Sequence, residues 1–268
     1  MPASDTRANR DDMELIARAA RAGGEIALSY FRKDPRRWTK ENDSPVSEAD
    51  LAVDRHLAEA LQAARPDYGW LSEETADDSS RLAARRSFVV DPIDGTRGFL
   101  AGSGEWTVAI AVVEDGRPVA AALFRPVGND LYTATLGQGA WLNGRGVAVS
   151  GQPALAGASV AGPKSITGQA PMMRTGISHA GYVPSLALRL ALVAEGRIDA
   201  AVVRENACDW DLAAADLLVQ EAGGRLEDLD GQPLAYNRAS VRHPALVAGP
   251  PALAAPLRPI LARLLTNP

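Results

Sequence analysis

The spacing of hydrophobic residues near the N-terminus predicts two helices. Ser47 has the side chain of an N-cap, and Val53, Leu57 and Leu61 follow it as the buried stripe of one helix. The polar stretch 33–45 before it is expected to form a loop or a loose hairpin. An earlier helix is expected from apolar side chains at roughly helical intervals after two aspartates: Met13, Ile16, Ala20, Ala27 and Phe31 after Asp11 and Asp12.

The middle of the chain is rich in predicted strands. Apolar runs at 105–114 and 117–124 flank Asp115-Gly116, a pair that is typical of a tight β-hairpin. A short apolar run at 87–91 precedes them, and the stretch 131–141 follows. Together these runs predict an antiparallel meander.

Beyond residue 150 the pattern predicts alternating helices and strands. Helices are expected at 184–195 and 210–222, each closed by glycine, and strands at 198–203 and 245–248. The last apolar stretch, 252–265, is interrupted by two prolines and is expected to form a helix packed on the surface. The chain is therefore expected to be α/β, with an N-terminal α+β subdomain (1–150) and a C-terminal α/β subdomain (151–268) that share one cleft.

The composition excludes several classes of protein. With 268 residues, 46% of them hydrophobic and 23% charged, the chain resembles an ordinary globular protein that buries a sizeable core. The net charge of −5 argues against binding to a nucleic acid polymer. Cys208 is the only cysteine in the sequence, which excludes a multi-cysteine zinc site and indicates a reducing compartment.

The N-terminus is polar, and no stretch approaches the roughly 18 apolar residues of a membrane span. We therefore expect no secretory signal and no transmembrane segment. A cytoplasmic protein is expected, and a peripheral association with the inner face of the membrane is left open.

Three acidic motifs stand at the ends of predicted elements. The hexapeptide Asp91–Thr96 ends a strand, and Gly95-Thr96 is suited to open a helical turn whose free N–H groups bind phosphate. The same residues are also typical of a solvated turn. Glu73-Glu74 ends a short apolar run, and Asp209-Trp-Asp211 begins a helix, where an aspartate is also a usual cap.

Oxygen ligands without histidine or cysteine suit Mg²⁺. If the acidic motifs converge, bound cations are needed, because two unit charges about 4 Å apart repel by about 4 kcal/mol at an effective dielectric constant near 20. The spacing Asp-x-x-Asp-Gly-Thr argues against the haloacid dehalogenase phosphatases, whose nucleophile motif is Asp-x-Asp-Gly-Thr.

The motifs and their order resemble the inositol monophosphatase superfamily. The matching elements are Ser47–Asp50, Glu73-Glu74, Asp91–Thr96 and Trp210–Ala214. This resemblance implies a layered αβαβα sandwich and Mg²⁺-dependent hydrolysis of a small phosphomonoester by direct attack of metal-activated water, without a phosphoenzyme.

The resemblance also implies a role for each matching residue. Glu73, Asp91 and the carbonyl of Ile93 would bind a first Mg²⁺, and Asp91, Asp94 and Asp211 a second, with a third, weaker ion near Glu73 left open. The implied catalytic residues are Asp50 and Thr96, which orient the attacking water, together with Glu73. The implied substrate contacts are Gly95, Thr96 and Asp211.

Within this superfamily the chain resembles the CysQ-type 3'(2'),5'-bisphosphate nucleotidases. The similarity lies in Ser44-Pro-Val-Ser47 and in Arg97, a basic residue after the threonine. Arg204, seven residues before Asp211, is predicted together with Lys164 to contact a second phosphate. Gly98, where a glutamate is expected, departs from the nucleotidase pattern.

We therefore predict hydrolysis of adenosine 3',5'-bisphosphate to AMP and phosphate. The nearest alternative is an inositol-1-monophosphatase or a broad sugar phosphatase, and histidinol phosphatase ranks third. A catalytically silent binding homologue is the alternative from a different class. The relatives include monomers and dimers, so a homodimer is left open.

Overall fold

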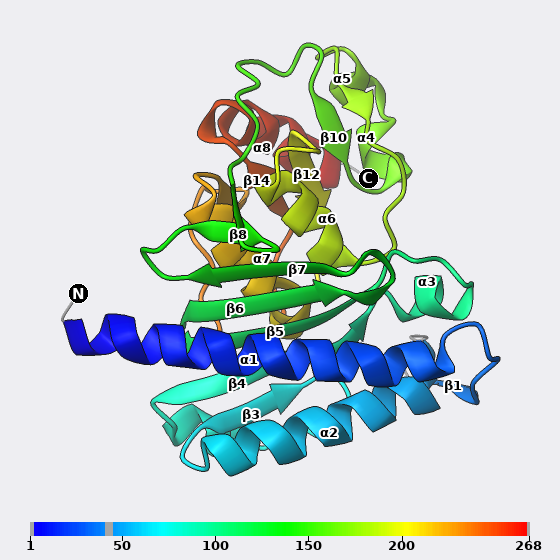
Figure 1. The fold of residues 1–268 in the computed structure, drawn as a ribbon. Coiled ribbons are helices and arrows are strands. Elements are labelled where there is room, and N and C mark those ends of the chain that lie inside the picture. Colours follow the sequence, from blue (N-terminus) through cyan, green and yellow to red (C-terminus); the bar gives the residue numbers. More distant parts are fainter. Residues whose placement is uncertain (1–2, 41–44, 267–268) are drawn as a thin grey trace.

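The computed structural model describes residues 3–40 and 45–266. Helices α1 (Ala3–Tyr30) and α2 (Glu48–Ala64) lie side by side over one face of the first sheet (Figure 1). Their apolar stripes, which include Ile16 and Leu57, are fully buried against that sheet. The helix α1 begins well before Asp11, because the hydrophobic pattern marks only its buried part and helix propagation extends the polar turns beyond it.

The first sheet has seven strands in sequential order, all antiparallel except for the first pair. A tight turn at Asp115-Gly116 joins β5 to β6, and both turn residues have positive φ, so the predicted hairpin is confirmed. The strands are β3 (Gly69–Ser72), β4 (Arg86–Asp94), β5 (Thr107–Glu114), β6 (Arg117–Arg125), β7 (Asp130–Thr135), β8 (Ala140–Leu142) and β9 (Arg145–Val147).

Short elements surround the edge of this sheet. The polar stretch before α2 forms a hairpin, of which residues 41–44 and therefore Ser44 lie outside the described residues. The elements are β1 (Arg37–Thr39), β2 (Pro45–Ser47), α3 (Thr96–Leu100) and the 3₁₀ helices η1 (Ser79–Ala83) and η2 (Pro126–Gly128).

The second sheet is mixed and has the order β11-β10-β12-β14-β13. Helices α6 and α7 lie between the two sheets, and α4, α5 and α8 cover the outer face of the second sheet (Figure 1). The elements are β10 (Ser159–Ala161), α4 (Lys164–Thr167), α5 (Ala170–Met173), β11 (Ser178–His179), α6 (Leu186–Ala194), β12 (Ala200–Val203), α7 (Asp209–Glu221), β13 (Arg225–Asp228), β14 (Leu246–Gly249) and α8 (Pro251–Thr266).

The layers follow the predicted αβαβα order. Helices α6 and α7 are buried along most of their length because they pack on both sheets, and Ala213 and Ala215 are fully buried. The predicted division at residue 150 falls in the connection between the two sheets, and whether each half is a separate unit stays a prediction.

Helix α8 is continuous, although Pro256 and Pro259 lie inside it. Each proline removes one backbone donor, but Leu253, Leu257 and Leu261 are fully buried against the second sheet, and their packing offsets this loss. No helix within residues 3–40 and 45–266 combines the length and the apolar character needed to cross a bilayer.

Candidate metal centre

Three aspartates from two distant parts of the chain meet at one site. Asp91 and Asp94 come from the end of β4, and Asp211 comes from the first turn of α7. One carboxylate oxygen from each lies within 4.8 Å of those of the other two. We refer to these three residues as the carboxylate cluster.

The end of β4 explains why Asp91 and Asp94 face the same side. In a regular strand, residues three apart point to opposite faces. The pairing of β4 with β5 shifts register between Asp91 and Asp94, and Ile93 N–H donates to Asp91 Oδ1 at 3.1 Å. This irregularity at Pro92 redirects the chain, so that both carboxylates point into the cluster.

Asp94 also joins the two halves of the molecule. Its carboxylate accepts hydrogen bonds from the Ser185 hydroxyl, from Leu186 N–H at 3.2 Å and from Ala187 N–H at 2.7 Å, all at the start of α6. Burial raises the pKa of Asp94 to about 6, although these hydrogen bonds act to lower it. The next residue, Gly95, has φ of +92°, and a Cβ there would lie 3.1 Å from Ser185, so glycine is required for this close approach.

The two aspartates at the start of α7 point in different directions. Asp211 Oδ2 accepts from Cys208 N–H at 2.6 Å, and burial, followed by the Asp94 charge, raises its pKa to about 8. Asp209 is fully buried and instead contacts His243 Nε2 at 2.7 Å and Asn237 N–H at 2.7 Å. Only Asp211 of this pair reaches the carboxylate cluster.

Asp50 and Thr96 form a buried pair beside the cluster. Thr96 Oγ1 lies 3.0 Å from Asp50 Oδ1 and 3.0 Å from the carbonyl oxygen of Ile93. The backbone N–H and the hydroxyl of Ser47 donate to the other Asp50 oxygen at 2.8 and 2.6 Å. Burial raises the pKa of Asp50, and these hydrogen bonds limit the rise. The sequence-based pairing of Asp50 with Thr96 therefore has matching geometry.

Glu73 lines the same cavity as the cluster and contacts a lysine that the motifs did not identify. Lys40 Nζ lies 3.0 Å from Glu73 Oε1 and 2.8 Å from Glu74 Oε1. Burial raises the pKa of Glu74 to about 7, and Lys40 opposes this rise. Burial acts to lower the pKa of Lys40, but the two glutamates raise it overall. No sequence signal singled out Lys40, because it lies in a polar hairpin without hydrophobic periodicity.

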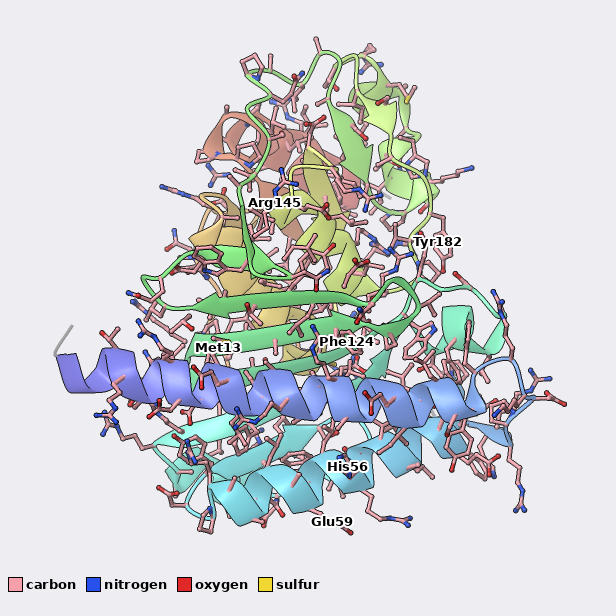
Figure 2. All side chains as sticks on the ribbon, viewed as in Figure 1. Met13, His56, Glu59, Phe124, Arg145 and Tyr182 are labelled. Atoms are coloured by element: carbon pink, nitrogen blue, oxygen red, sulfur yellow. The ribbon has the colours of Figure 1, made fainter. Side chains whose placement is uncertain are left out.

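A cavity of about 170 Å³ opens onto these groups. Gly95 and Thr96 contribute to its wall beside Glu73, Ile93 and the cluster. Its lining also includes Pro45, Arg97, Tyr182 and Pro184. The sequence motifs did not assign a role to Tyr182 or Pro184. Tyr182 projects outward on the side of the molecule where α3 lies (Figure 2).

The two predicted contacts for a second phosphate are not brought to this cavity. The Arg204 guanidinium donates to the Ser165 hydroxyl and lines a separate cavity of about 850 Å³, whose wall includes Ile166 and Leu264. Lys164 begins α4 and is not among the described residues that line the cavity of the carboxylates.

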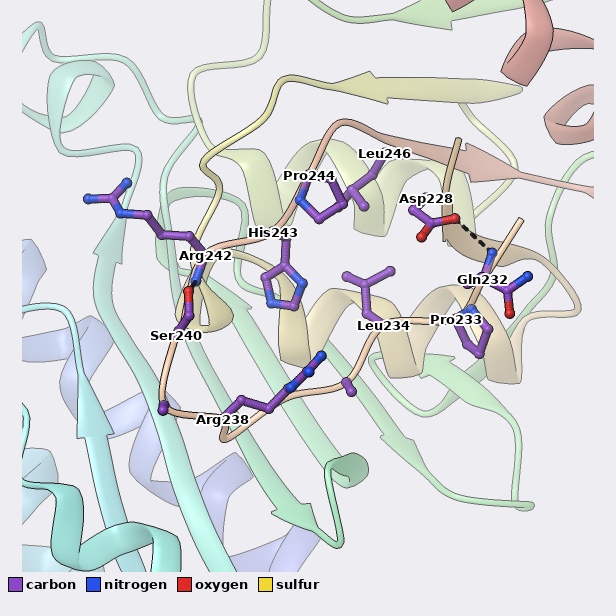
Figure 3. A pocket seen from close by; sticks show the side chains of 12 residues that line it. Asp228, Gln232, Pro233, Leu234, Arg238, Ser240, Arg242, His243, Pro244 and Leu246 are labelled. Atoms are coloured by element: carbon purple, nitrogen blue, oxygen red, sulfur yellow. Dashed lines mark hydrogen bonds between the residues drawn. The ribbon is translucent and has the colours of Figure 1, made fainter. Parts of the chain in front are cut away.

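A third cavity, of about 360 Å³, lies beside β13 and the segment that leads to β14. Figure 3 shows the ring of His243 near Leu234 and Arg238 in this cavity. It is connected to the start of α7 through the contact between His243 and Asp209, but it contains none of the clustered carboxylates.

Comparisons with known proteins agree with the motifs. The model of the inositol monophosphatase family matches residues 9–261. An inositol-1-monophosphatase from Rhizobium meliloti is 37% identical over 69% of this chain and 73% of that protein. The 3'(2'),5'-bisphosphate nucleotidase CysQ from Aggregatibacter actinomycetemcomitans is 29% identical over 93% of this chain and 95% of that protein.

A solved structure shows the same fold. The extragenic suppressor protein suhB from Bartonella henselae superposes with a TM-score of 0.81 at 29% identity. The match covers 94% of this chain and 98% of that one. The five-layer arrangement is therefore shared along nearly the whole chain.

Proposed function

This chain belongs to the inositol monophosphatase family, and on that premise we propose that it is a Mg²⁺-dependent phosphatase whose metal ions bind at the carboxylate cluster. The observation that carries the proposal is the convergence of Asp91, Asp94 and Asp211, with ligand oxygens within 4.8 Å of one another, beside the buried pair of Asp50 and Thr96. The supported activity is hydrolysis of a phosphomonoester.

The residues at the cluster fit Mg²⁺. Its donors are carboxylate oxygens, which Mg²⁺ prefers, and neither histidine nor cysteine takes part. Burial and neighbouring carboxylates raise the pKa of both Asp91 and Asp211. Three ionised groups at these distances are therefore unfavourable without a nearby cation.

Each residue of the site has a proposed task. Glu73, Asp91 and the Ile93 carbonyl hold one ion, and Asp91, Asp94 and Asp211 hold a second. When bound, Mg²⁺ neutralises phosphate charge and increases the acidity of a bound water.

The chain's own residues position the attacking water and the phosphate. The Thr96 hydroxyl donates to Asp50, so a lone pair of its oxygen can accept a hydrogen bond from the attacking water. As the water attacks, it transfers a proton to Thr96, which passes its own hydroxyl proton to Asp50. The raised pKa of Asp50 favours this role. Gly95 and Thr96 border the cavity at the start of α3 and hold the phosphate.

The proposed substrate is adenosine 3',5'-bisphosphate. Support comes from the nucleotidase-like residues Pro45–Ser47, from Arg97 at the cavity and from the CysQ relative that covers nearly the whole chain. Arg97 is better placed to meet a second phosphate than the predicted Arg204, which lines another cavity. Inositol 1-phosphate is the second candidate, because the inositol-1-monophosphatase relative has the higher identity.

Phosphate release tests the proposal directly. Adenosine 3',5'-bisphosphate and inositol 1-phosphate are compared with Mg²⁺ at equal concentrations. A hundredfold higher kcat/KM for the nucleotide, about 2.7 kcal/mol of discrimination, supports the nucleotidase. A higher kcat/KM for inositol 1-phosphate would leave the proposed metal site unchanged and make inositol 1-phosphate the substrate.

The Asp91→Asn variant tests the metal site. It should abolish turnover while the chain stays folded, because Asp91 is proposed to contact both ions. Wild-type activity in this variant would overturn the ligand assignment. Binding of Mg²⁺ by the wild-type chain without release of phosphate from either substrate would instead indicate a silent binding homologue.

A further inference from the structure

Tyr182 combines high exposure with a place in the candidate active site. The residue is 72% exposed, the highest value among the exposed large hydrophobic residues on the described part of the chain. It nevertheless lines the same cavity as Asp91 and Thr96. An exposed aromatic ring beside a polar site offers an apolar face to whatever enters that site.

The backbone is held two residues before Tyr182, where Ala180 N–H donates to the Val160 carbonyl oxygen at 3.1 Å, and directly after it. Val183 is buried in the core between the two sheets, and Arg189 Nη2 donates to its carbonyl oxygen at 2.9 Å. Pro184 packs so closely on Gly98 that a Cβ at Gly98 would lie 2.9 Å from Pro184 Cβ. The exposure of the Tyr182 ring therefore reflects its direction rather than a detached loop.

The lining of the cavity contains two kinds of side chain. The acidic ones are Glu73 and the carboxylate cluster, beside which metal-bound phosphate is proposed to lie. The remaining lining includes Pro45, Arg97, Tyr182 and Pro184, which have apolar or basic side chains. A leaving group attached to the phosphate can therefore contact the apolar surfaces of Tyr182 and Pro184 and the positive charge of Arg97.

We propose that Tyr182 forms a leaving-group subsite that stacks a planar aromatic ring, such as a nucleobase, of the phosphomonoester substrate. The inference rests on the proposed phosphatase function and specifies the substrate class that the site prefers. Tyrosine orders only two side-chain torsions on contact, so the stacking loses little entropy. A saturated polyol ring presents no aromatic face and gains less from this contact.

Two pairs of compounds test the subsite. AMP and ribose 5-phosphate, which differ by the base, serve as binding probes in Mg²⁺ buffer by calorimetry. Adenosine 3',5'-bisphosphate and glycerol 2-phosphate serve as substrates. Tyr182→Ser should weaken AMP binding and raise KM for the nucleotide about tenfold, which corresponds to about 1.4 kcal/mol. Ribose 5-phosphate binding and glycerol 2-phosphate hydrolysis should change less than about twofold.

Two further variants separate stacking from general effects. Tyr182→Phe keeps the ring and should retain the wild-type KM for the nucleotide. Trp141→Ser removes another exposed aromatic side chain, from β8 in the first sheet, and should leave both compound pairs unaffected. The thermal midpoint of Tyr182→Ser should match the wild type, since the ring is mostly exposed.

The outcomes distinguish this subsite from the phosphatase function itself. Equal losses for AMP and ribose 5-phosphate, or no loss for either, would overturn the subsite even if the chain hydrolyses both substrates. If no substrate is hydrolysed, the phosphatase function fails. A loss confined to AMP in Tyr182→Ser would still support the stacking contact.

Discussion

Replacing Asp211 by asparagine is expected to stabilise the metal-free chain and to abolish its activity. Asparagine is nearly isosteric and keeps an oxygen for the Cys208 N–H, which donates to Asp211 at 2.6 Å. The substitution removes one of the three clustered charges. The variant therefore keeps the shape of the side chain and changes only its charge.

The magnitude follows from the geometry of the cluster. The ligand oxygens of the cluster lie within 4.8 Å of one another, and at that separation two unit charges repel by about 3.5 kcal/mol at an effective dielectric constant of about 20. Burial, followed by the Asp94 charge, raises the pKa of Asp211 from 3.8 to about 8, so at pH 8 the unfolded chain ionises this group far more readily than the folded chain. Each pKa unit corresponds to about 1.4 kcal/mol in the free energy of unfolding, and the partial exposure of Asp211 reduces the total. We therefore expect Asp211→Asn to increase the free energy of unfolding of the metal-free chain by about 2–3 kcal/mol.

Asp209→Asn is the matched control, because the two aspartates lie in the same helical turn. Asp209 is fully buried and contacts His243 Nε2 at 2.7 Å and Asn237 N–H at 2.7 Å. Its replacement weakens a satisfied buried pair and should lower stability by about 1–3 kcal/mol. Its effect on turnover should be mild, since it does not reach the cluster.

Thermal unfolding at pH 8 with a chelator measures both effects. A gain of about 2 kcal/mol in Asp211→Asn should raise the midpoint by about 4–8 °C in a chain of this size. Added Mg²⁺ should raise the wild-type midpoint but that of Asp211→Asn much less. A lower midpoint for Asp211→Asn, or equal effects of the two substitutions on turnover, would refute the assignment of Asp211 to an uncompensated metal site.

Three other predictions address the wider molecule. The metal-free wild-type chain should lose stability as the pH rises from about 4 to about 8, because folding raises the pKa of Asp94 to about 6 and that of Asp211 to about 8, and the folded state therefore holds more protons in this window. Unfolding at several pH values, with and without excess Mg²⁺, measures this dependence. A free energy of unfolding that increases with pH in the metal-free chain would contradict the prediction. Arg204→Ala should change KM for adenosine 3',5'-bisphosphate and inositol 1-phosphate by the same small factor, since Arg204 lines another cavity, and a selective rise for the bisphosphate in parallel kinetics would restore its predicted role. Arg86→Met should lower the free energy of unfolding in urea by about 1–3 kcal/mol. It removes a guanidinium that lies 2.7 Å from the buried carboxylate of Asp12 and 2.9 Å from that of Glu114, although Asp12 keeps its contact with Arg65 and Glu114 keeps its contact with Arg85. An unchanged free energy of unfolding would contradict this.

Local patterns predicted most of the secondary structure. The hairpin at Asp115-Gly116 and helices α2, α6 and α7 were identified because each has a clear periodicity bounded by turn or cap residues. An error lay at the start of α1, where the turns before Asp11 have no apolar stripe to mark them. The helix predicted at 252–265 is confirmed, and the packing of three leucines keeps it continuous through two prolines.

The order of residues along the chain predicted which chemical groups were available and near which element ends they would lie. The hexapeptide Asp91–Thr96 and the Asp209-Trp-Asp211 motif have the residue types of an oxygen-only metal site, and their order along the chain matched a family. Packing in three dimensions set what the motifs did not contain: the contact of Lys40 with Glu73 and the place of Arg204 at another cavity. The physical reason is that hydrophobic periodicity reports the burial of apolar faces, whereas the convergence of like charges has no periodic signal. It is imposed against electrostatic repulsion by the packing of two sheets around α6 and α7.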